Sequence, residues 1–271
     1  MAVIPLKRWQ GKWALVTGAS SGIGVALATE LAAGGTNLVL TARRKDRLVD
    51  LAAKLGAEEG IRVEVCVADL LQDSAPAEIF EFTRERGLEI DLLINNAGFG
   101  AYGEFAGVDL ERLLGMVKVN VAAVVHLTHL FLRPMIARRR GDILILASTA
   151  SFQGVPYLAT YGATKAFDLL FAEAIAEEVA RYGIRVCALC PGTTDSEFHS
   201  VARQTHVMKG RKGETSEKVA HVGLVALASG KSSVISGAGN LLGAELQRIL
   251  PRRLVTKTVA RLFGPPKETK T

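Results

Sequence analysis

Tyr161 and Lys165 are two residues of this chain whose types and spacing could do chemistry together. A step of four residues on a helix returns to nearly the same face, so the phenol and the ammonium would lie side by side. An ammonium beside a phenol favours the phenolate and lowers the pKa of the phenol from about 10. Such a pair could transfer protons near neutral pH. Ser148, thirteen residues upstream, could donate a hydrogen bond to a substrate oxygen.

A glycine-rich turn provides a second chemical signal. The run Gly18-Ala19-Ser20-Ser21-Gly22-Ile23-Gly24 follows an apolar segment of strand length and precedes a segment of helical period. Glycines let the backbone turn tightly and approach a pyrophosphate, and the N-terminus of the next helix attracts it. The position of this turn predicts a dinucleotide site, whereas an isolated glycine-rich turn would be only weak evidence.

The elements that must position these residues alternate regularly between strand and helix. Together they predict an α/β fold with a single Rossmann-type, doubly wound parallel sheet of about seven strands and helices on both faces. No linker interrupts the pattern, so we expect a single domain over 1–271. The expected strands are 13–17, 38–42, 63–68, 92–95, 143–147, 185–190 and, more weakly, 233–236. The expected helices are 23–33, 45–59, 75–86, 109–139 and 159–182.

The C-terminal third of the chain is more polar and more basic. Residues 195–217 read as a long loop, and such loops often cover a site, so we expect a substrate loop there. Residues 240–263 read as a helical segment that Pro251 divides, and 264–271 as a frayed tail.

With Asn95-Asn96-Ala97-Gly98 added to the glycine turn, Ser148 and Tyr161-x3-Lys165, the chain closely resembles the short-chain dehydrogenase/reductase family. The resemblance covers 12–237. Its glycine spacing, Gly-x3-Gly-x-Gly, differs from the Gly-x-Gly-x-x-Gly of other Rossmann dehydrogenases. Four motifs in the right order make a chance match improbable.

The resemblance implies roles for individual residues. Tyr161 would be the proton donor, and Ser148 would polarise the carbonyl. Lys165 would lower the pKa of Tyr161, and Asn120 would bind a water of the proton relay. Ser196 stands where the family often has a threonine that contacts the nicotinamide. The implied cofactor-binding residues are Gly18, Ser20, Ser21, Gly22, Ile23, Gly24, Arg43, Arg44, Asp69, Leu70, Asn96, Ala97, Gly98, Tyr161, Lys165, Pro191, Gly192, Thr193 and Thr194.

The choice of cofactor depends on the residues after the second strand. Members that use NAD usually place an aspartate there to bind the ribose 2′-hydroxyl. This chain reads Thr41-Ala42-Arg43-Arg44-Lys45, with no acid before Asp46. A guanidinium can grip a 2′-phosphate with two hydrogen bonds, so we expect NADP(H), with Arg43 the best candidate and Arg44 the second.

The expected substrate pocket is apolar or aromatic, without a fixed charge as an anchor. Its predicted lining is Phe99, Tyr102, Ala150, Phe152, Gln153, Tyr157 and Phe198, together with the 195–217 loop. Each of these side chains could instead belong to the core.

The leading hypothesis is an NADP(H)-dependent enzyme that interconverts a hydrophobic ketone or aldehyde and its alcohol. One alternative is a reductase of 3-oxoacyl thioesters, because Arg138-Arg139-Arg140 could receive an acidic carrier protein. The more remote alternative is a dinucleotide-binding regulator without turnover, although such proteins generally lose the Tyr/Lys pair.

Composition and charge restrict the partners. Residues 201–271 hold thirteen Lys/Arg against four Asp/Glu, but without aromatic interleaving or a nucleic-acid motif, so we expect no nucleic-acid partner. A contact of the C-terminal helical segment with anionic lipid is possible, but we favour a flap over the site or a subunit contact. The family's habit implies a homodimer or homotetramer. With no signal-like start, the expected location is the cytoplasm. Cys187 and Cys190 would point to opposite faces of a strand, so we expect no metal site.

Overall fold

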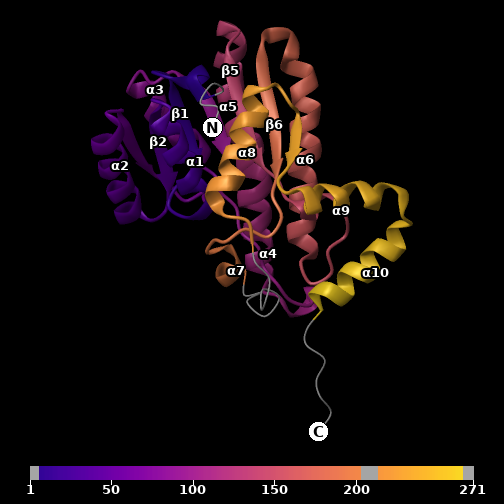
Figure 1. Ribbon diagram of the computed structural model, residues 1–271. Helices are drawn as coiled ribbons and strands as arrows, with labels where there is room; N and C mark the ends of the chain where they lie inside the picture. Colours follow the sequence, from indigo (N-terminus) through magenta and orange to yellow (C-terminus); the bar gives the residue numbers. More distant parts are fainter. Residues whose placement is uncertain (1–5, 203–212, 265–271) are drawn as a thin grey trace.

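The computed structural model describes residues 6–202 and 213–264, and its centre is a parallel sheet in the order β3-β2-β1-β4-β5-β6-β7 (Figure 1). The strands are β1 Trp13–Thr17, β2 Asn37–Ala42, β3 Val63–Val67, β4 Ile90–Asn95, β5 Gly141–Leu146, β6 Ile184–Cys190 and β7 Ser233–Ile235. Every pairing is parallel. The predicted doubly wound fold class is therefore confirmed. The chain reverses its direction of travel across the sheet between β1 and β4, and the carboxyl ends of strands at such a point open into a ligand crevice.

Helices cover both faces of the sheet (Figure 1). One core cluster joins the sheet to α1 Gly22–Ala33, α2 Lys45–Glu59 and α8 Ser216–Ala228. The other core cluster joins it to α3 Ala75–Glu85, α5 Ala123–Arg138 and α6 Ala159–Val179. The central strands β1 and β4 are buried along their whole length. Their continuous apolar runs reflect this burial on both faces.

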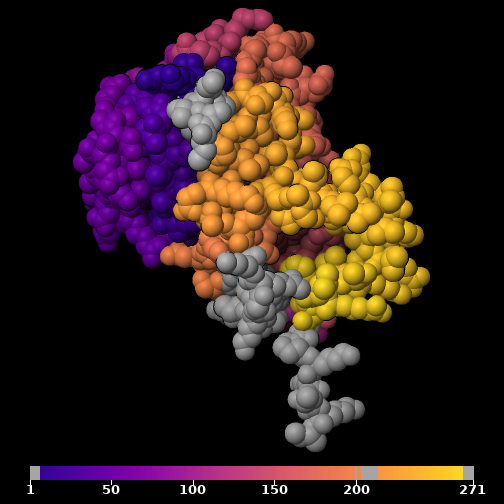
Figure 2. Space-filling view, viewed as in Figure 1, coloured from indigo at the N-terminus to yellow at the C-terminus, as the bar shows by residue number. Residues whose placement is uncertain are grey.

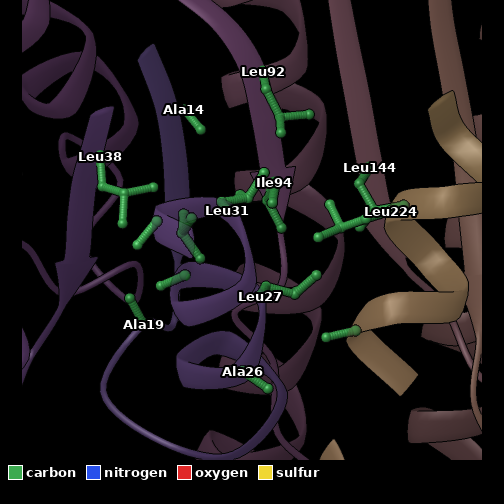
Figure 3. Packing of buried hydrophobic residues seen from close by; sticks show 14 of the residues in the cluster. Ala14, Ala19, Ala26, Leu27, Leu31, Leu38, Leu92, Ile94, Leu144 and Leu224 are labelled. Carbon is green, nitrogen blue, oxygen red and sulfur yellow. The ribbon is translucent and has the colours of Figure 1, made fainter. Parts of the chain in front are cut away.

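The first of these cores is built from branched aliphatic side chains that interdigitate between layers. Figure 3 shows Leu27 and Leu31 of α1 facing Ile94 of β4, with Leu224 of α8 beside Leu144 of β5. All five are at most 1% exposed. This packing fixes the start of α1 against β1, where the glycine turn lies.

The predicted long helix over 109–139 is interrupted. It consists of α4 Leu110–Val117, a π-helical turn Lys118–Ala122 that carries Asn120, and α5. The stretch Leu110–Arg138 is long and apolar enough to cross a membrane by length and composition, but half of its most apolar window is buried. Since α5 packs against β4 and β5, it is a layer of this fold.

Helix α8 is absent from the sequence prediction, although it contributes to the first core. Thr215 caps it by accepting a hydrogen bond from the Lys218 N–H at 3.2 Å. Its buried residues recur at helical spacing, with Val219, Gly223 and Leu227 inside. That spacing and the capping threonine were the available signals.

The C-terminal segment forms two helices, α9 Ala238–Ile249 and α10 Arg252–Phe263, which Pro251 separates as predicted. They project from the body of the molecule (Figure 2). The short helix α7 Phe198–Val201 lies within the predicted 195–217 loop, of which 203–212 falls outside the described residues. Of the predicted tail, only Gly264 is described. Short 3₁₀ turns at Leu6–Trp9, Phe105–Gly107, Thr149–Phe152 and Ala180–Tyr182 complete the described elements.

Candidate active site

The glycine turn forms a close-fitting cradle at the carboxyl end of β1. Gly18 adopts a φ of +67°, and a Cβ there would lie 2.9 Å from the Ala97 Cα. Asn96 braces the turn by donating from its amide nitrogen to the Thr17 carbonyl at 2.8 Å. The Ser21 side chain makes no capping hydrogen bond to α1. The N–H groups at the start of α1 therefore remain available to a phosphate.

Gly24, at the start of α1, lies in close contact with the turn. A Cβ at Gly24 would overlap the Gly18 carbonyl and lie 2.7 Å from the Asn96 amide nitrogen, and neither group can move freely. We expect Gly24→Ala to displace the turn and weaken binding of NADPH by at least about tenfold, measured by fluorescence titration. Gly107→Ala is the matched control, since a Cβ there meets nothing within 4 Å. Equal NADPH affinity in the two variants would contradict the cradle.

The two arginines after β2 have different surroundings. Arg44 donates to the Ser20 hydroxyl at 3.1 Å and forms an ion pair with Glu197 at 2.7 Å. Arg47 forms an ion pair with the other Glu197 oxygen at 2.6 Å. Arg43 lines the cleft, and the part of the chain that the structure describes offers it no ion pair or hydrogen bond. Arg43 is therefore free to bind an anion, while Arg44 and Glu197 hold the rim of the cleft.

The segment after β6 forms the opposite wall. The Thr149 N–H donates to the Pro191 carbonyl at 2.9 Å, which ties this turn to the residue after Ser148. Thr194 is buried and turns its hydroxyl back to the Gly192 carbonyl at 3.2 Å. Thr193 also lines the cleft. Of the two predicted threonines, Thr193 is thus the better candidate for a contact with the nicotinamide carboxamide.

Ser148, Tyr161 and Lys165 converge in the same cleft. The Ser148 side chain is hydrogen-bonded to the Tyr161 hydroxyl, and its oxygen also accepts from the Ala150 N–H at 3.1 Å. The Lys165 Nζ donates to the Leu146 carbonyl at 2.6 Å and lies near Tyr161 on the face of α6 that points toward β5. The phenol, the ammonium and the serine therefore lie close together in the structure, as predicted.

Two opposing influences act on the pKa of Tyr161. Burial raises the pKa, and Lys165 and Ser148 lower it by a smaller amount, so that it lies above the ordinary value. The sequence-based expectation of a lowered pKa is therefore right about the influence of Lys165 and wrong about the net direction. At neutral pH the phenol keeps its proton and is available as a proton donor.

Asn120 acts as a clamp within the π-helical turn. Its Nδ2 donates to the Phe99 carbonyl at 3.0 Å and to the Thr164 hydroxyl at 3.1 Å, and its Oδ1 accepts from the Phe99 N–H at 3.1 Å. Both amide N–H groups are thus used within the protein. The side chain joins the segment after β4 to α6, and it has no donor left for the predicted relay water.

The substrate end of the cleft is apolar. The Phe198 ring lies 5.1 Å from the Tyr161 ring, and the further apolar side chains lining this end are Phe99, Ala150, Val155, Leu158, Val201 and Phe263. Val255 and Val259 of α10 pack against Ala150 and Leu158, so α10 covers this end. The whole cleft, from the glycine turn to this end, has a volume of about 390 Å³.

Three of the seven predicted lining residues, Tyr102, Phe152 and Tyr157, lie outside the lining of the cleft. Phe152 packs against the core between the sheet and α6. Tyr157 adopts a φ of +66° and stacks on Tyr102 at 5.9 Å, outside the lining of the cleft. An aromatic residue near Ser148 in sequence can face either way, and here the 3₁₀ turn Thr149–Phe152 directs Phe152 inward.

The remaining predicted cofactor residues line the cleft as expected from the motifs: Ser20, Ser21, Gly22, Ile23, Asp69, Leu70, Asn96, Ala97, Gly98, Pro191 and Gly192. Val155 and Leu158 at the substrate end were not predicted, and three further residues were missed. Glu197 and Phe263 come from the loop and from the end of α10, where the sequence has no motif. Asp168 lies one helical turn beyond Lys165, and that spacing was the available signal.

A parallel sheet with a phosphate-binding turn at its reversal point, next to a Ser/Tyr/Lys set, defines a dinucleotide-dependent oxidoreductase of alcohols and carbonyl compounds. The family model described as short chain dehydrogenase matches residues 12–206. The chain belongs to this family.

Similar proteins include enzymes with lipid-like substrates in their names. A very-long-chain 3-oxoacyl-CoA reductase from Anas platyrhynchos is 34% identical over 199 residues, which are 71% of this chain and 63% of that protein. The alignments span between 53% and 82% of the length of the curated relatives.

Two solved structures resemble the whole fold. A short-chain dehydrogenase from Sphingobium yanoikuyae in complex with NADPH has a TM-score of 0.79 and 30% identity, and covers 89% of this chain and 97% of its own. A 7beta-hydroxysteroid dehydrogenase has a TM-score of 0.84 and 27% identity, and covers 94% of this chain and 99% of its own.

Proposed function

We propose that the protein is an NADP(H)-dependent oxidoreductase that interconverts a bulky hydrophobic ketone or aldehyde and the corresponding alcohol. The observation that carries this proposal is the apolar substrate end of the cleft. Among the described lining residues there, Tyr161 and Lys165 alone are ionisable. Such a pocket suits an uncharged apolar molecule held by its one polar group at Ser148 and Tyr161.

Different residues bind the carbonyl oxygen and protonate it. Ser148 donates a hydrogen bond that holds and polarises the oxygen, and Tyr161 gives it a proton as negative charge develops there. The bound cofactor supplies or accepts the hydride. Lys165 stabilises the phenolate that Tyr161 leaves behind, because its charge lowers the pKa of the phenol. Because Tyr161 remains protonated at neutral pH, the site is suited to reduction.

The NADP(H) assignment is supported by the residues that would surround the adenosine ribose. The cradle of Gly18 and Gly24 has room for backbone contact with phosphate but none for a side chain, which fits a dinucleotide. Arg43 lines the cleft with an unused guanidinium, which fits a 2′-phosphate. The similar dehydrogenase from Sphingobium yanoikuyae binds NADPH.

A reductase of 3-oxoacyl thioesters is the second candidate, and the similarity to a 3-oxoacyl-CoA reductase favours it. The arginines that first suggested it do not. Arg138 donates to the Ile90 carbonyl, and Arg140 forms an ion pair with Asp91 at 2.6 Å. These contacts lie at the amino ends of β4 and β5, the opposite edge of the sheet from the cleft, so this arginine cluster cannot guide a carrier to Tyr161.

A substrate panel tests the proposal. We expect NADPH oxidation with bulky ketones such as 3-, 7- and 17-ketosteroids and aryl ketones, and at least about tenfold lower kcat/KM with short polar ketones. Turnover of 3-oxoacyl-CoA alone would favour the second candidate. No turnover of any carbonyl or alcohol with either NADPH or NADH would refute both.

A further inference from the structure

Asp168 is a buried carboxylate that has no role in the mechanism proposed above. It lies on α6, one turn beyond Lys165, and is 0% exposed. Its Oδ2 accepts from the Lys165 Nζ at 3.0 Å, while its Oδ1 has no hydrogen-bond partner among the described residues. Burying a carboxylate with one unpartnered oxygen is costly, and the cost must be offset by what the other oxygen does.

The ammonium of Lys165 has three donors, and two of them are fixed inside the protein. One donates to Asp168 on α6, and the other to the Leu146 carbonyl at the end of β5. Lys165 nevertheless lines the cleft. The two inner contacts therefore hold the nitrogen at the wall of the cleft and leave its third N–H for Tyr161 or a cofactor ribose.

The charge of Lys165 also depends on its neighbours. Burial lowers the pKa of Lys165, and Asp168 is the largest opposing influence, so the net pKa is raised. The other titratable groups that act on Lys165 are Tyr161 on α6 and Cys190 on β6. Burial raises the pKa of Cys190 to about 12, so this thiol is neutral. The neighbouring π-helical turn and β5 supply Asn120 and the Leu146 carbonyl, which carry no net charge.

We propose that Asp168 is a positioning residue that keeps Lys165 charged and directed at the cleft in the alkaline range, where alcohols are oxidised. Burial raises the pKa of Asp168 to about 6, so the carboxylate is ionised at and above neutral pH. Without that negative charge, the effect of burial on Lys165 loses its largest opposing influence, and the pKa of Lys165 falls. Lys165 then becomes neutral as the pH rises, and Tyr161 loses the cation that stabilises its phenolate.

Asp168→Asn tests this proposal because it keeps the shape and an acceptor but removes the charge. The first measurement is the pKa of Lys165 by NMR of protein labelled with [ε-¹³C]lysine, with the signal assigned from Lys165→Arg. We expect the pKa of Lys165 to fall by about one to two pH units. Glu177→Gln, an exposed acid on the same helix, is the matched control and should leave it unchanged. If the pKa of Lys165 in Asp168→Asn were the same as in the wild-type protein, the proposal would be overturned.

The second measurement is the pH profile of kcat/KM for alcohol oxidation, which rests on the proposed function. Relative to wild type, the kcat/KM of Asp168→Asn should be less than about threefold lower at pH 7, and the loss should grow above pH 9 to as much as about tenfold at pH 10. A loss of the same size at every pH would indicate only a structural role and would also overturn the proposal. If no substrate is turned over, the proposed function fails, whereas the lysine titration still decides the role of Asp168.

Discussion

Tyr161→Phe is expected to reduce kcat for carbonyl reduction by about 10³-fold, within the range that general acid catalysis contributes. The substitution removes only the hydroxyl. The ring keeps its place against Phe198 at 5.1 Å, so the substrate end of the cleft should keep its shape. Lys165 keeps its bonds to Asp168 and Leu146, so binding of NADPH should change by less than about threefold. Steady-state kinetics and fluorescence titration of NADPH would measure the two quantities.

Tyr157→Phe is the matched control for this variant. Tyr157 lies only four residues earlier and was a candidate for the pocket, yet it stacks on Tyr102 outside the lining of the cleft. Its hydroxyl should be dispensable, with kcat within about twofold of wild type. Retention of most of the activity by Tyr161→Phe would show that the proton comes from another group.

The sequence predicts the central part of this site because its residues directly follow the ends of strands. The glycine turn follows β1, Asn96 follows β4, Ser148 follows β5 and Pro191 follows β6. The carboxyl ends of parallel strands meet at one edge of a sheet, so a correct order of strands and helices is enough to bring these residues together.

The parts that the sequence did not predict depend on packing across the fold. The net pKa of Tyr161 depends on burial by residues far along the chain, including Phe198. The position of α10 over the cleft depends on the direction of α9, the helix that precedes it. Likewise, Glu197 gains its role only because the segment after β6 crosses to Arg44 and Arg47. Local periodicity carries no information on such contacts.

Cofactor selectivity is expected to depend on Arg43. We predict that Arg43→Ala lowers kcat/KM for NADPH by about 30-fold, equivalent to the loss of charge-assisted hydrogen bonds worth about 2 kcal/mol. The same variant should change kcat/KM for NADH by less than about threefold, because a ribose hydroxyl offers no charge for the guanidinium. Steady-state kinetics with both cofactors would measure the ratio.

Arg47→Ala is the matched control, since Arg47 also pairs with Glu197 but does not line the cleft. The selectivity for NADPH should survive this change. Arg44→Ala should weaken both cofactors together, because Arg44 bonds to Ser20 within the phosphate-binding turn. If Arg43→Ala lowered kcat/KM equally for NADPH and NADH, Arg43 would be supporting the turn and would not be binding the 2′-phosphate. A preference of the wild-type enzyme for NADH would refute the assignment of the cofactor itself.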